Sequence, residues 1–317
     1  MHVEDRKTNY PVRVAIAVIT YQRPNLLAQL LQSLADQRLE TESLQVRIVV
    51  VDNDPKASAE GTVQDVQPAV PWAITYVAEA DPGIPSARQR SVDLCPEDDV
   101  VIFVDDDEIC PQGWLQALIT QWQTSGADVV TGPVHGILPP DVPSWNRYSD
   151  VHSSRGKHRT GELLTKAYTN NTLVTRVVLD AVTPTFDPRF RFSGSSDLHF
   201  FQRVHRAGFA IVWCEEAEVR EHVPPERTTL RWLVRRAFRS GAGDTISRRL
   251  IRPGVTSIVE GLAFATARLG SGVALMLVGL LPGQGHHRIK GVRRFFSAAG
   301  SYAGLIGINY NEYRRSS

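Results

Sequence analysis

Three consecutive aspartates, Asp105, Asp106 and Asp107, directly follow an apolar run at residues 100–104. The run is short and mostly β-branched, which is typical of a strand buried on both faces of a largely parallel sheet. The aspartates would then stand at the carboxyl end of the strand, where open α/β sheets bind ligands. Carboxylate oxygens from Asp105 and Asp107 suit Mg²⁺ or Mn²⁺ bound together with a phosphorylated ligand. A solvated acidic turn is the alternative interpretation.

Polar side chains also follow the first two predicted strands. After residues 12–19, the loop carries Thr20, Tyr21 and Arg23, so that an aromatic ring could meet a base and a guanidinium a phosphate. Tyr21 could equally be a packing residue. The second strand ends in Asp52, whose carboxylate could accept a hydrogen bond from a nucleobase or a ribose hydroxyl.

A loop rich in glycine and proline follows the third predicted strand. It contains Gly83, and a helix expected to begin at Ser86 or Ala87 would direct its N–H groups and Arg88 towards one place. This arrangement suits an anionic ligand.

Three later features could also contribute to a site. Asp197 lies in the expected first turn of a helix, where it is either a favourable N-terminal acid worth about 0.3–1 kcal/mol or a general base. His222 is either a metal ligand or a histidine with a purely structural hydrogen bond. Arg235 and Arg239 recur at helical spacing, on a basic face that is either solvated or closes over a diphosphate.

Alternating apolar segments predict the elements that must position these residues. Four strands that end in polar clusters, mostly separated by helical patterns, indicate a doubly wound sheet with one continuous binding edge. Neither a Gly-x-Gly-x-x-Gly fingerprint nor a P-loop is present. The expected strands lie at residues 12–19, 46–51, 74–77, 100–104, 129–130, 169–174 and 211–214; helices are expected at 26–34 and 111–123, and a long loop at 135–165.

Composition limits the class of protein. The 317 residues can form one large α/β domain, or a domain of about 240 residues with an appendage. The net charge of +1 provides no global field that favours nucleic acid. The three scattered cysteines fit a reducing compartment, and the polar N-terminus does not resemble a signal peptide. A cytoplasmic site of action is expected.

Residues 255–281 are apolar and small, and charged side chains follow them. The longest uncharged run, residues 269–284, is short for a bilayer span of about 20 apolar residues. We therefore expect helices that lie in a membrane interface. The basic residues expected to meet anionic headgroups are Arg288, Lys290, Arg293, Arg294, Arg314 and Arg315.

Across residues 12–245, the motifs together resemble the family 2 glycosyltransferases, inverting enzymes with the nucleotide-sugar-binding GT-A fold. The family opening is matched by residues 18–24, and its base-binding acid by Asp52. Its Gly…Ala-Arg-Asn loop is matched by residues 83–89, with glutamine in place of asparagine, and its DxD motif by residues 105–107.

Two family motifs depart from the pattern. The Glu-Asp motif appears as Ser196-Asp197, so the base aspartate is retained without the preceding acid. The Gln/Arg-x-x-Arg-Trp motif of processive members has Thr228 in its first position, which favours single addition. His222 matches a late histidine that completes the metal shell in many GT-A enzymes.

The resemblance implies an α/β, Rossmann-like GT-A catalytic domain at residues 1–249, with a mixed, mostly parallel sheet flanked by helices. A helical, membrane-associating extension is expected at residues 250–317. The implied activity is metal-dependent, inverting and non-processive transfer of one sugar, from a nucleotide-diphosphate sugar to a hydroxyl of a glycan or lipid-linked acceptor. Such enzymes build bacterial exopolysaccharides or lipid-linked glycans, and the expected location is the inner face of the cell membrane.

The resemblance also assigns roles to residues. Asp197 is the expected catalytic base. The donor is expected to bind Thr20, Tyr21, Arg23, Asp52, Gly83, Arg88, Asp105, Asp106, Arg235 and Arg239. The expected ligands of Mg²⁺ or Mn²⁺ are Asp105, Asp107 and His222.

Two other functions fit parts of the sequence. A sugar-phosphate nucleotidyltransferase would require a glycine-rich first β–α turn, but residues 20–25 contain no glycine. A non-catalytic nucleotide-sugar-binding module would be consistent with Ser196 in place of an acid, although the retained aspartates argue against it.

Overall fold

The chain divides into two compact units, each assembled from several segments. The computed structural model describes residues 11–40, 43–148, 151–154, 156–191 and 193–308. The first unit comprises Met1–His135, Ser154–Arg191 and Arg203–Glu221. The second comprises Gly136–Ser153, Phe192–Gln202 and His222–Ser317. Arg314 and Arg315 lie outside the described residues.

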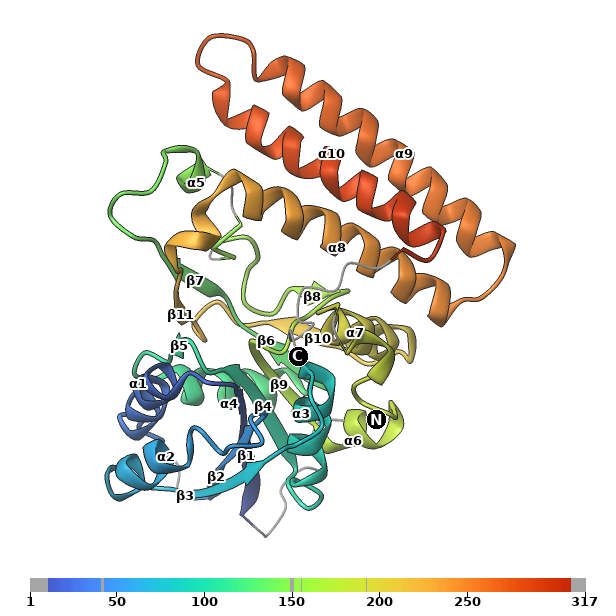
Figure 1. The fold of residues 1–317 in the computed structure, drawn as a ribbon. Coiled ribbons are helices and arrows are strands. Elements are labelled where there is room, and N and C mark those ends of the chain that lie inside the picture. Colours follow the sequence, from blue (N-terminus) through green and yellow to red (C-terminus); the bar gives the residue numbers. More distant parts are fainter. Residues whose placement is uncertain (1–10, 41–42, 149–150, 155, 192, 309–317) are drawn as a thin grey trace. The chain divides into compact units, whose positions relative to one another are not determined.

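An eight-stranded sheet forms the centre of the first unit, in the order β3-β2-β1-β4-β9-β6-β10-β8 (Figure 1). Neighbours among β3, β2, β1 and β4 are parallel, as are β6 and β10, whereas β9 is antiparallel to both β4 and β6. β8 is antiparallel to β10. The mixed, mostly parallel sheet predicted from the sequence is confirmed. The strands are β1 (Val12–Thr20), β2 (Leu44–Asp52), β3 (Ala73–Ala78), β4 (Val100–Asp105), β6 (Val129–Thr131), β8 (Leu163–Leu164), β9 (Asn171–Thr175) and β10 (Ile211–Trp213).

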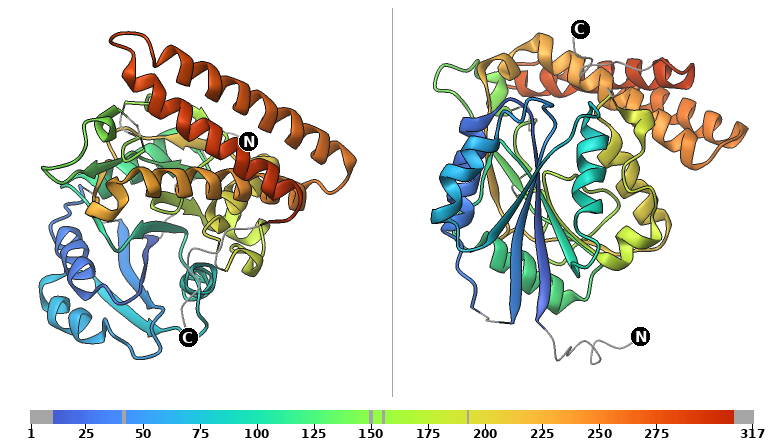
Figure 2. Two further views of the ribbon diagram at one scale, coloured as in Figure 1. Left: turned by 45° about the horizontal axis from the view of Figure 1, so that its top comes forward. Right: turned by 60° about the horizontal axis from the view of Figure 1, so that its bottom comes forward.

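Helices cover both faces of the sheet because its central strands are apolar on both sides. Along β1, Val14, Ile16 and Val18 belong to the core that packs under α1 (Pro24–Ala35), α2 (Glu60–Val66) and α4 (Trp114–Ser125). Ala15 and Ala17, which alternate with these residues along the strand, face the other side of the sheet and are also buried. On that other face α3 (Ile84–Asp93) contacts β1 and β2 (Figure 2). The remaining helical elements of this unit are α6 (Arg176–Ala181), η2 (Gln67–Ala69) and η3 (Pro188–Phe190).

Two expectations about local structure need correction. α3 begins at Ile84 rather than at Ser86 or Ala87, because Pro85 fits the first helical turn, where no N–H partner is required. The segment expected to be a long loop contains β7 (Val134–Ile137), α5 (Trp145–Tyr148) and β8. β7 belongs to a three-stranded sheet of order β5-β11-β7, whose other strands are β5 (Glu108–Ile109) and β11 (Val219–His222).

Long helices dominate the second unit. α8 (Leu230–Ile251), α10 (Gly285–Leu305) and α9 (Val255–Val278) lie side by side with α10 in the middle (Figure 1). Glycines allow this close approach: a Cβ on Gly300 would collide with Phe238, and one on Gly272 would lie 2.8 Å from the Phe295 nitrogen. α7 (Ser196–Arg206) starts in this unit, and η4 (Pro225–Thr228) precedes α8.

α9 leaves much of its apolar surface uncovered. Within the described part of the chain, it is the one helix long and apolar enough to cross a membrane, judged by length and composition alone, and 17% of its most apolar window is buried. Arg268 bonds inward to the Ser297 hydroxyl at 2.7 Å, and Glu260 lies 3.7 Å from Arg252. Large apolar side chains exposed along α9 are Val255, Ile258, Val259, Leu262, Phe264, Val273, Leu277 and Val278.

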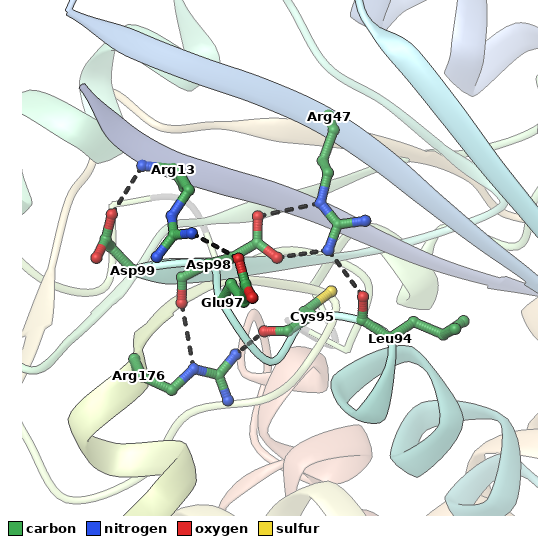
Figure 3. Close-up of polar contacts among 8 residues, drawn as sticks. All are labelled: Arg13, Arg47, Leu94, Cys95, Glu97, Asp98, Asp99 and Arg176. Carbon is green, nitrogen blue, oxygen red and sulfur yellow. Dashed lines mark hydrogen bonds and ion pairs between the residues drawn. The ribbon is translucent and has the colours of Figure 1, made fainter. Parts of the chain in front are cut away.

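At the end of the sheet where β4 begins, arginines hold the preceding loop (Figure 3). Arg47 donates to the Asp98 carboxylate at 3.1 and 2.5 Å and to the Leu94 carbonyl at 2.8 Å. The hydrogen bond to Asp98 raises the pKa of Arg47 despite partial burial. Arg176 donates to the carbonyls of Asp98 and Cys95. These contacts fix where β4 starts, and therefore where its other end presents Asp105.

The three cysteines are free and buried, as the scattered spacing suggested. Burial, with a smaller contribution from Asp98, raises the pKa of Cys95 to about 12. At neutral pH this thiol is protonated and unreactive.

Substitution of Asp98 by asparagine should destabilise the first unit. Asp98 is 4% exposed and accepts two hydrogen bonds from Arg47, so the variant leaves the half-buried Arg47 guanidinium without its charged partner. We expect the free energy of unfolding to fall by about 2 kcal/mol, measured by urea denaturation. Glu97→Gln is the matched control, because the Glu97 side chain is 80% exposed where it meets Arg13. Equal losses in the two variants would contradict this role for Asp98.

Candidate functional site

The carboxyl ends of β1, β2 and β4 bring several predicted residues to one edge of the first unit. In the parallel register Thr20 lies opposite Asp52, and Ile19 lies opposite Asp105. The loops that continue from these strands carry Tyr21, Arg23, Asp106 and Asp107. The predicted convergence of strand ends is therefore present in the fold.

Two arginines neutralise the acidic end of β4. Arg23 donates through Nη1 to Asp106 at 3.2 Å and to Asp107 at 3.1 Å. Arg88, from α3, donates to Asp105 at 3.0 Å. Three adjacent carboxylates would repel one another, and these guanidinium groups supply the opposing charge.

Asp106 is the inward-facing member of the acidic cluster. Its side chain is 7% exposed, and the buried Thr20 hydroxyl donates to it at 2.8 Å. Burial raises the pKa of Asp106 to about 6, and Asp107 and Asp105 add to the rise, while Arg23 and the Thr20 hydrogen bond oppose it. The same carboxylates raise the pKa of Arg23, more than offsetting the lowering effect of its own burial.

Glu108 stabilises the turn that follows β4. It is 1% exposed and accepts the backbone N–H of Asp105 at 2.9 Å. Burial, followed by the charge of Asp105, holds its pKa well above the usual range. Glu108 is a structural acid that the sequence analysis did not single out.

The chemistry of the acidic edge fits a divalent cation that shares its coordination with a ligand. The Asp105 side chain is 33% exposed and that of Asp107 is 11% exposed, so both are more accessible than Asp106. Among the residues that the structure describes, no group of three or more histidine, cysteine or acidic side chains is arranged to hold a metal. Mg²⁺ is commonly bound by one or two carboxylates plus substrate phosphates, and Asp105 and Asp107 match that donor set.

The Gly83 loop is held by residues that lie far apart in sequence. Gly83 has φ +124° and donates to Asn53 Oδ1 at 2.8 Å, and Asn53 Nδ2 donates to the Asp81 carbonyl at 2.7 Å. Arg191 donates to the Pro82 carbonyl at 2.5 Å and forms an ion pair with Asp81. A Cβ on Gly83 would lie 2.6 Å from Arg191 Cγ, so both conformation and space require glycine. Asn53 follows a strand end and could have been suspected, whereas no local pattern identifies Arg191.

Asp52 occupies a more buried position than a ligand-binding acid requires. It is 0% exposed and accepts hydrogen bonds from the backbone of Asp54 and Ala59 and from the Tyr76 hydroxyl, at 3.0, 2.8 and 2.9 Å. These bonds fix the turn that leads to α2. A contact between Asp52 and a nucleotide stays a prediction. It would require one of the three hydrogen bonds to the Asp52 carboxylate to break.

The turn between β1 and α1 contains a strained residue that the sequence analysis missed. Gln22 has φ +54°, and its side chain donates to Asp54 at 3.1 Å. On either side of it, Tyr21 is 37% exposed and Arg23 reaches the acidic cluster. The backbone reversal at Gln22 therefore separates the Tyr21 ring from the Arg23 guanidinium, which contacts the acidic cluster although the Arg23 side chain is 43% exposed.

Four predicted site residues belong to the second unit. Asp197 lies in the first turn of α7, as expected, and its carboxylate accepts the Leu198 N–H at 2.7 Å. His222 is exposed at the end of β11. On α8, Arg235 is exposed and Arg239 is partly buried.

Trp232 has a partner that the sequence did not reveal. His152 stacks on its ring with a centroid distance of 5.1 Å and an interplanar angle of 19°, and the Arg236 guanidinium lies 5.1 Å from the ring centroid. Burial, followed by the charges of Arg236 and Arg227, lowers the pKa of His152 to about 4. A neutral imidazole therefore packs on Trp232 at physiological pH.

The mostly parallel sheet, with acidic and basic loops at one edge and C-terminal helices, has the architecture of the GT-A glycosyltransferases. The family model described as "Glycosyl transferase family 2" matches residues 15–183, more than half of the chain, and the chain belongs to this family. It is 34% identical over 300 residues to the "Succinoglycan biosynthesis protein ExoM" of Rhizobium meliloti (strain 1021), covering 95% of each sequence. The chain is a glycosyltransferase, as its motifs predicted.

Two solved structures show the same fold. The mannosyltransferase PcManGT from Pyrobaculum calidifontis, in complex with GDP-Man and Mn²⁺, has a TM-score of 0.61 and 18% identity, over 94% of this chain and 88% of that one. TarS 1–349 from S. aureus, in complex with UDP, has a TM-score of 0.53 and 15% identity, over 92% of this chain and 91% of that one. At these identities the likeness concerns architecture.

Replacing Asp106 with asparagine should stabilise the ligand-free protein at neutral pH. The folded-state pKa of about 6 exceeds the ordinary value of 3.8, so the protonated carboxyl favours folding below pH 4 and this advantage is lost as pH rises through 6. The variant should raise the free energy of unfolding at pH 7.5 by up to about 3 kcal/mol, with no gain near pH 4. Urea denaturation at both pH values, in the presence of a chelator, measures the difference. A destabilised variant at pH 7.5 would show that Asp106 is held by its partners more strongly than burial disfavours it.

Proposed function

We propose that this glycosyltransferase transfers one sugar from a nucleotide-diphosphate sugar to a hydroxyl of a glycan or lipid-linked acceptor, with inversion at the anomeric carbon. The arrangement that carries the proposal is the acidic end of β4, where Arg23 and Arg88 bind Asp105, Asp106 and Asp107. A cluster that combines fixed cations with accessible carboxylates suits a diphosphate and a divalent cation together.

The donor is proposed to bind along the strand-end edge of the first unit. Arg23 and Arg88 would donate to the diphosphate, whose negative charge increases as the glycosidic bond to it breaks. Tyr21 offers an exposed ring to the base, and the Gly83 loop offers close backbone approach. Thr20 and Asp106 act by orienting Arg23, whereas Asp52 shapes the neighbouring turn.

Mg²⁺ or Mn²⁺ would be held by Asp105 and Asp107, with His222 as a further ligand, and would supply charge neutralisation for the leaving nucleoside diphosphate. The relative PcManGT was solved with GDP-Man and Mn²⁺, which supports this choice of cofactor. Arg235 and Arg239 on α8 are proposed as additional donors to the diphosphate.

Asp197 is proposed as the general base. Its carboxylate would take the proton from the acceptor hydroxyl while that oxygen attacks the anomeric carbon, and the nucleoside diphosphate would leave from the opposite side. Thr228 in place of the first residue of the processive motif supports addition of a single sugar. The similarity to a protein named for succinoglycan biosynthesis supports an exopolysaccharide intermediate as the acceptor.

We further propose that the protein acts as a peripheral protein on the cytoplasmic face of the membrane. The exposed side chains of α9 provide an apolar surface, and α10 carries Arg288, Lys290, Arg293 and Arg294. An apolar helix face flanked by basic residues binds anionic bilayers, with about 1 kcal/mol contributed by each basic residue near the surface. Such a location would place the enzyme beside a lipid-linked acceptor.

Asp107→Ala should abolish metal-dependent donor binding and leave the fold intact. The experiment is a thermal-shift panel of UDP-, GDP- and dTDP-sugars with Mn²⁺, Mg²⁺ or EDTA, since a donor that binds the native state must raise its Tm. The wild type should respond to one donor class, and only with metal, whereas the variant should not respond. An unchanged response in the variant, or a wild-type response in EDTA, would refute the metal proposal.

Asp197→Asn should retain donor binding in the same panel and lose transfer by a factor of about 10² or more. Release of the nucleoside diphosphate from the selected donor is the measured reaction. Asp93→Asn, at the end of α3, is the control because it removes a carboxylate from an exposed position. Near-normal turnover of Asp197→Asn would remove this residue from the mechanism.

Charged substitutions on the outer face of α9 should weaken membrane binding. The Val259 and Leu277 side chains are 59% and 61% exposed, so Val259→Asp and Leu277→Asp do not place a charge in the protein core. We expect the full chain to sediment with vesicles containing phosphatidylglycerol, less strongly at high salt, and the double variant to remain in solution. Val177→Asp on α6 is the matched control, since Val177 is 61% exposed in the first unit. If the double variant and the control bind the vesicles equally well, the outer face of α9 is not the membrane-binding surface.

A further inference from the structure

A buried polar chain joins the start of α7 to the middle of α8 within the second unit. The contact is close: a Cβ on Gly243 of α8 would collide with the Ser195 hydroxyl, which lies just before α7. Ser195 and Ser247 are 5% and 0% exposed. The backbone of α8 therefore packs directly against the segment that leads into Asp197.

The hydrogen bonds of this chain have a defined direction. Asp244 accepts from Arg248 Nε at 3.1 Å and, as a carboxylate, also accepts from Gln202 Nε2 at 2.7 Å. This orients Gln202 so that its Oε1 faces Ser247, whose hydroxyl donates to it at 2.5 Å. The Ser247 hydrogen is then in use, so His199 Nδ1, at 2.9 Å from the Ser247 oxygen, must be the donor.

This directionality makes the arrangement specific. Each group accepts or donates in only one sense once Asp244 is ionised. His199, Asp244 and Ser247 are buried, so water does not readily replace a lost partner there, whereas Gln202 is half-buried and Arg248 is exposed. His199 and Asp244 are 3% and 5% exposed. A shift of α7 along α8 would break the bonds at His199 and Gln202 together, leaving buried polar groups unsatisfied.

We propose that Ser247 and Gln202, anchored by Asp244, are positioning residues that fix the first turn of α7 and thereby the carboxylate of Asp197. The inference rests on the proposed role of Asp197 as the base. His199 lies half a turn after Asp197 on the same helix, so the bond that holds its ring also limits rotation and sliding of that turn. A displacement of about 1 Å of a catalytic group can cost about 10²-fold in rate.

The principal test compares Ser247→Ala with Ser301→Ala in the full chain. Ser301 on α10 is also 0% exposed and donates to the backbone carbonyls of Gly241 and Ser297, so the control deletes an equally buried hydroxyl whose hydrogen bonds go to α8 and α10. The reaction measured is release of nucleoside diphosphate with water as the acceptor, from the donor selected by the thermal-shift panel. Ser247→Ala should lower kcat at least tenfold with the KM for the donor unchanged, whereas Ser301→Ala should leave kcat within twofold.

A double-mutant cycle tests whether the effect passes through Asp197. If Ser247 acts by positioning the base, Ser247→Ala should cause no further loss in an Asp197→Asn background. An equal loss in both backgrounds would overturn the proposal. If Asp197→Asn alone turns over normally, the assignment of the base fails. If Asp197→Asn is inactive while Ser247→Ala and Ser301→Ala have the same kcat, Asp197 remains the proposed base and only the positioning role of Ser247 is refuted.

Hydrogen exchange provides a readout that does not depend on activity. Ser247→Ala should accelerate amide exchange in residues 193–202 relative to both the wild type and Ser301→Ala. Ser247→Cys, which keeps the shape of the side chain at a slightly larger volume and replaces the hydroxyl with a weak donor, serves the same comparison if the alanine variant does not fold. Unchanged exchange in this segment would overturn the proposal.

Discussion

Neutralisation of the three adjacent carboxylates at the end of β4 is the interaction on which the rest of the first unit depends. Asp105, Asp106 and Asp107 are kept together by Arg23 from the β1–α1 turn and by Arg88 from α3. Burial raises the pKa of Asp106 to about 6, and the two neighbouring carboxylates add to the rise, while Arg23 opposes it. Three ionised carboxylates and two guanidinium groups leave this edge with a net negative charge. That charge would favour a further cation, which could in turn bind a diphosphate.

Contacts at both ends of β4 position this acidic edge. At the start of β4, Arg47 and Arg176 hold the preceding loop, which sets where the strand begins. At the other end, the reversal at Gln22 precedes Arg23, and Gly83, with its positive φ, precedes α3, which carries Arg88. Both arginines reach the aspartates. These conformations are costly for most residues, and the contacts of Asn53 and Arg191 maintain the second of them.

Much of the fold could be predicted from the sequence because its central strands are short, apolar and followed by polar residues. β1 to β4 and the polar residues at their carboxyl ends follow from that pattern, as does the position of Asp197 in the first turn of α7. The antiparallel insertion of β9 and the two-residue strand β8 carry no comparable local signal. Their pairing depends on contacts between residues distant in the chain.

The candidate site was predicted in its residue types but not in its contacts. The partners of Asp106 come from two other segments, and the sequence does not reveal that Arg23 rather than a neighbouring cation reaches it. Asp52 was expected to face a ligand, yet its carboxylate is satisfied by its own turn and by Tyr76. Supporting residues such as Arg191 and Ser247 act through tertiary contacts, which no local spacing encodes.

We propose that the acidic edge of the first unit binds a nucleoside diphosphate through a divalent cation. Anomalous diffraction from crystals of the full chain, grown with Mn²⁺ and the nucleoside diphosphate that stabilises it most, tests this directly. We expect one manganese peak within bonding distance of Asp105 or Asp107, with a diphosphate oxygen in the same coordination shell. A diphosphate bound away from this edge, or manganese bound without either carboxylate, would contradict it.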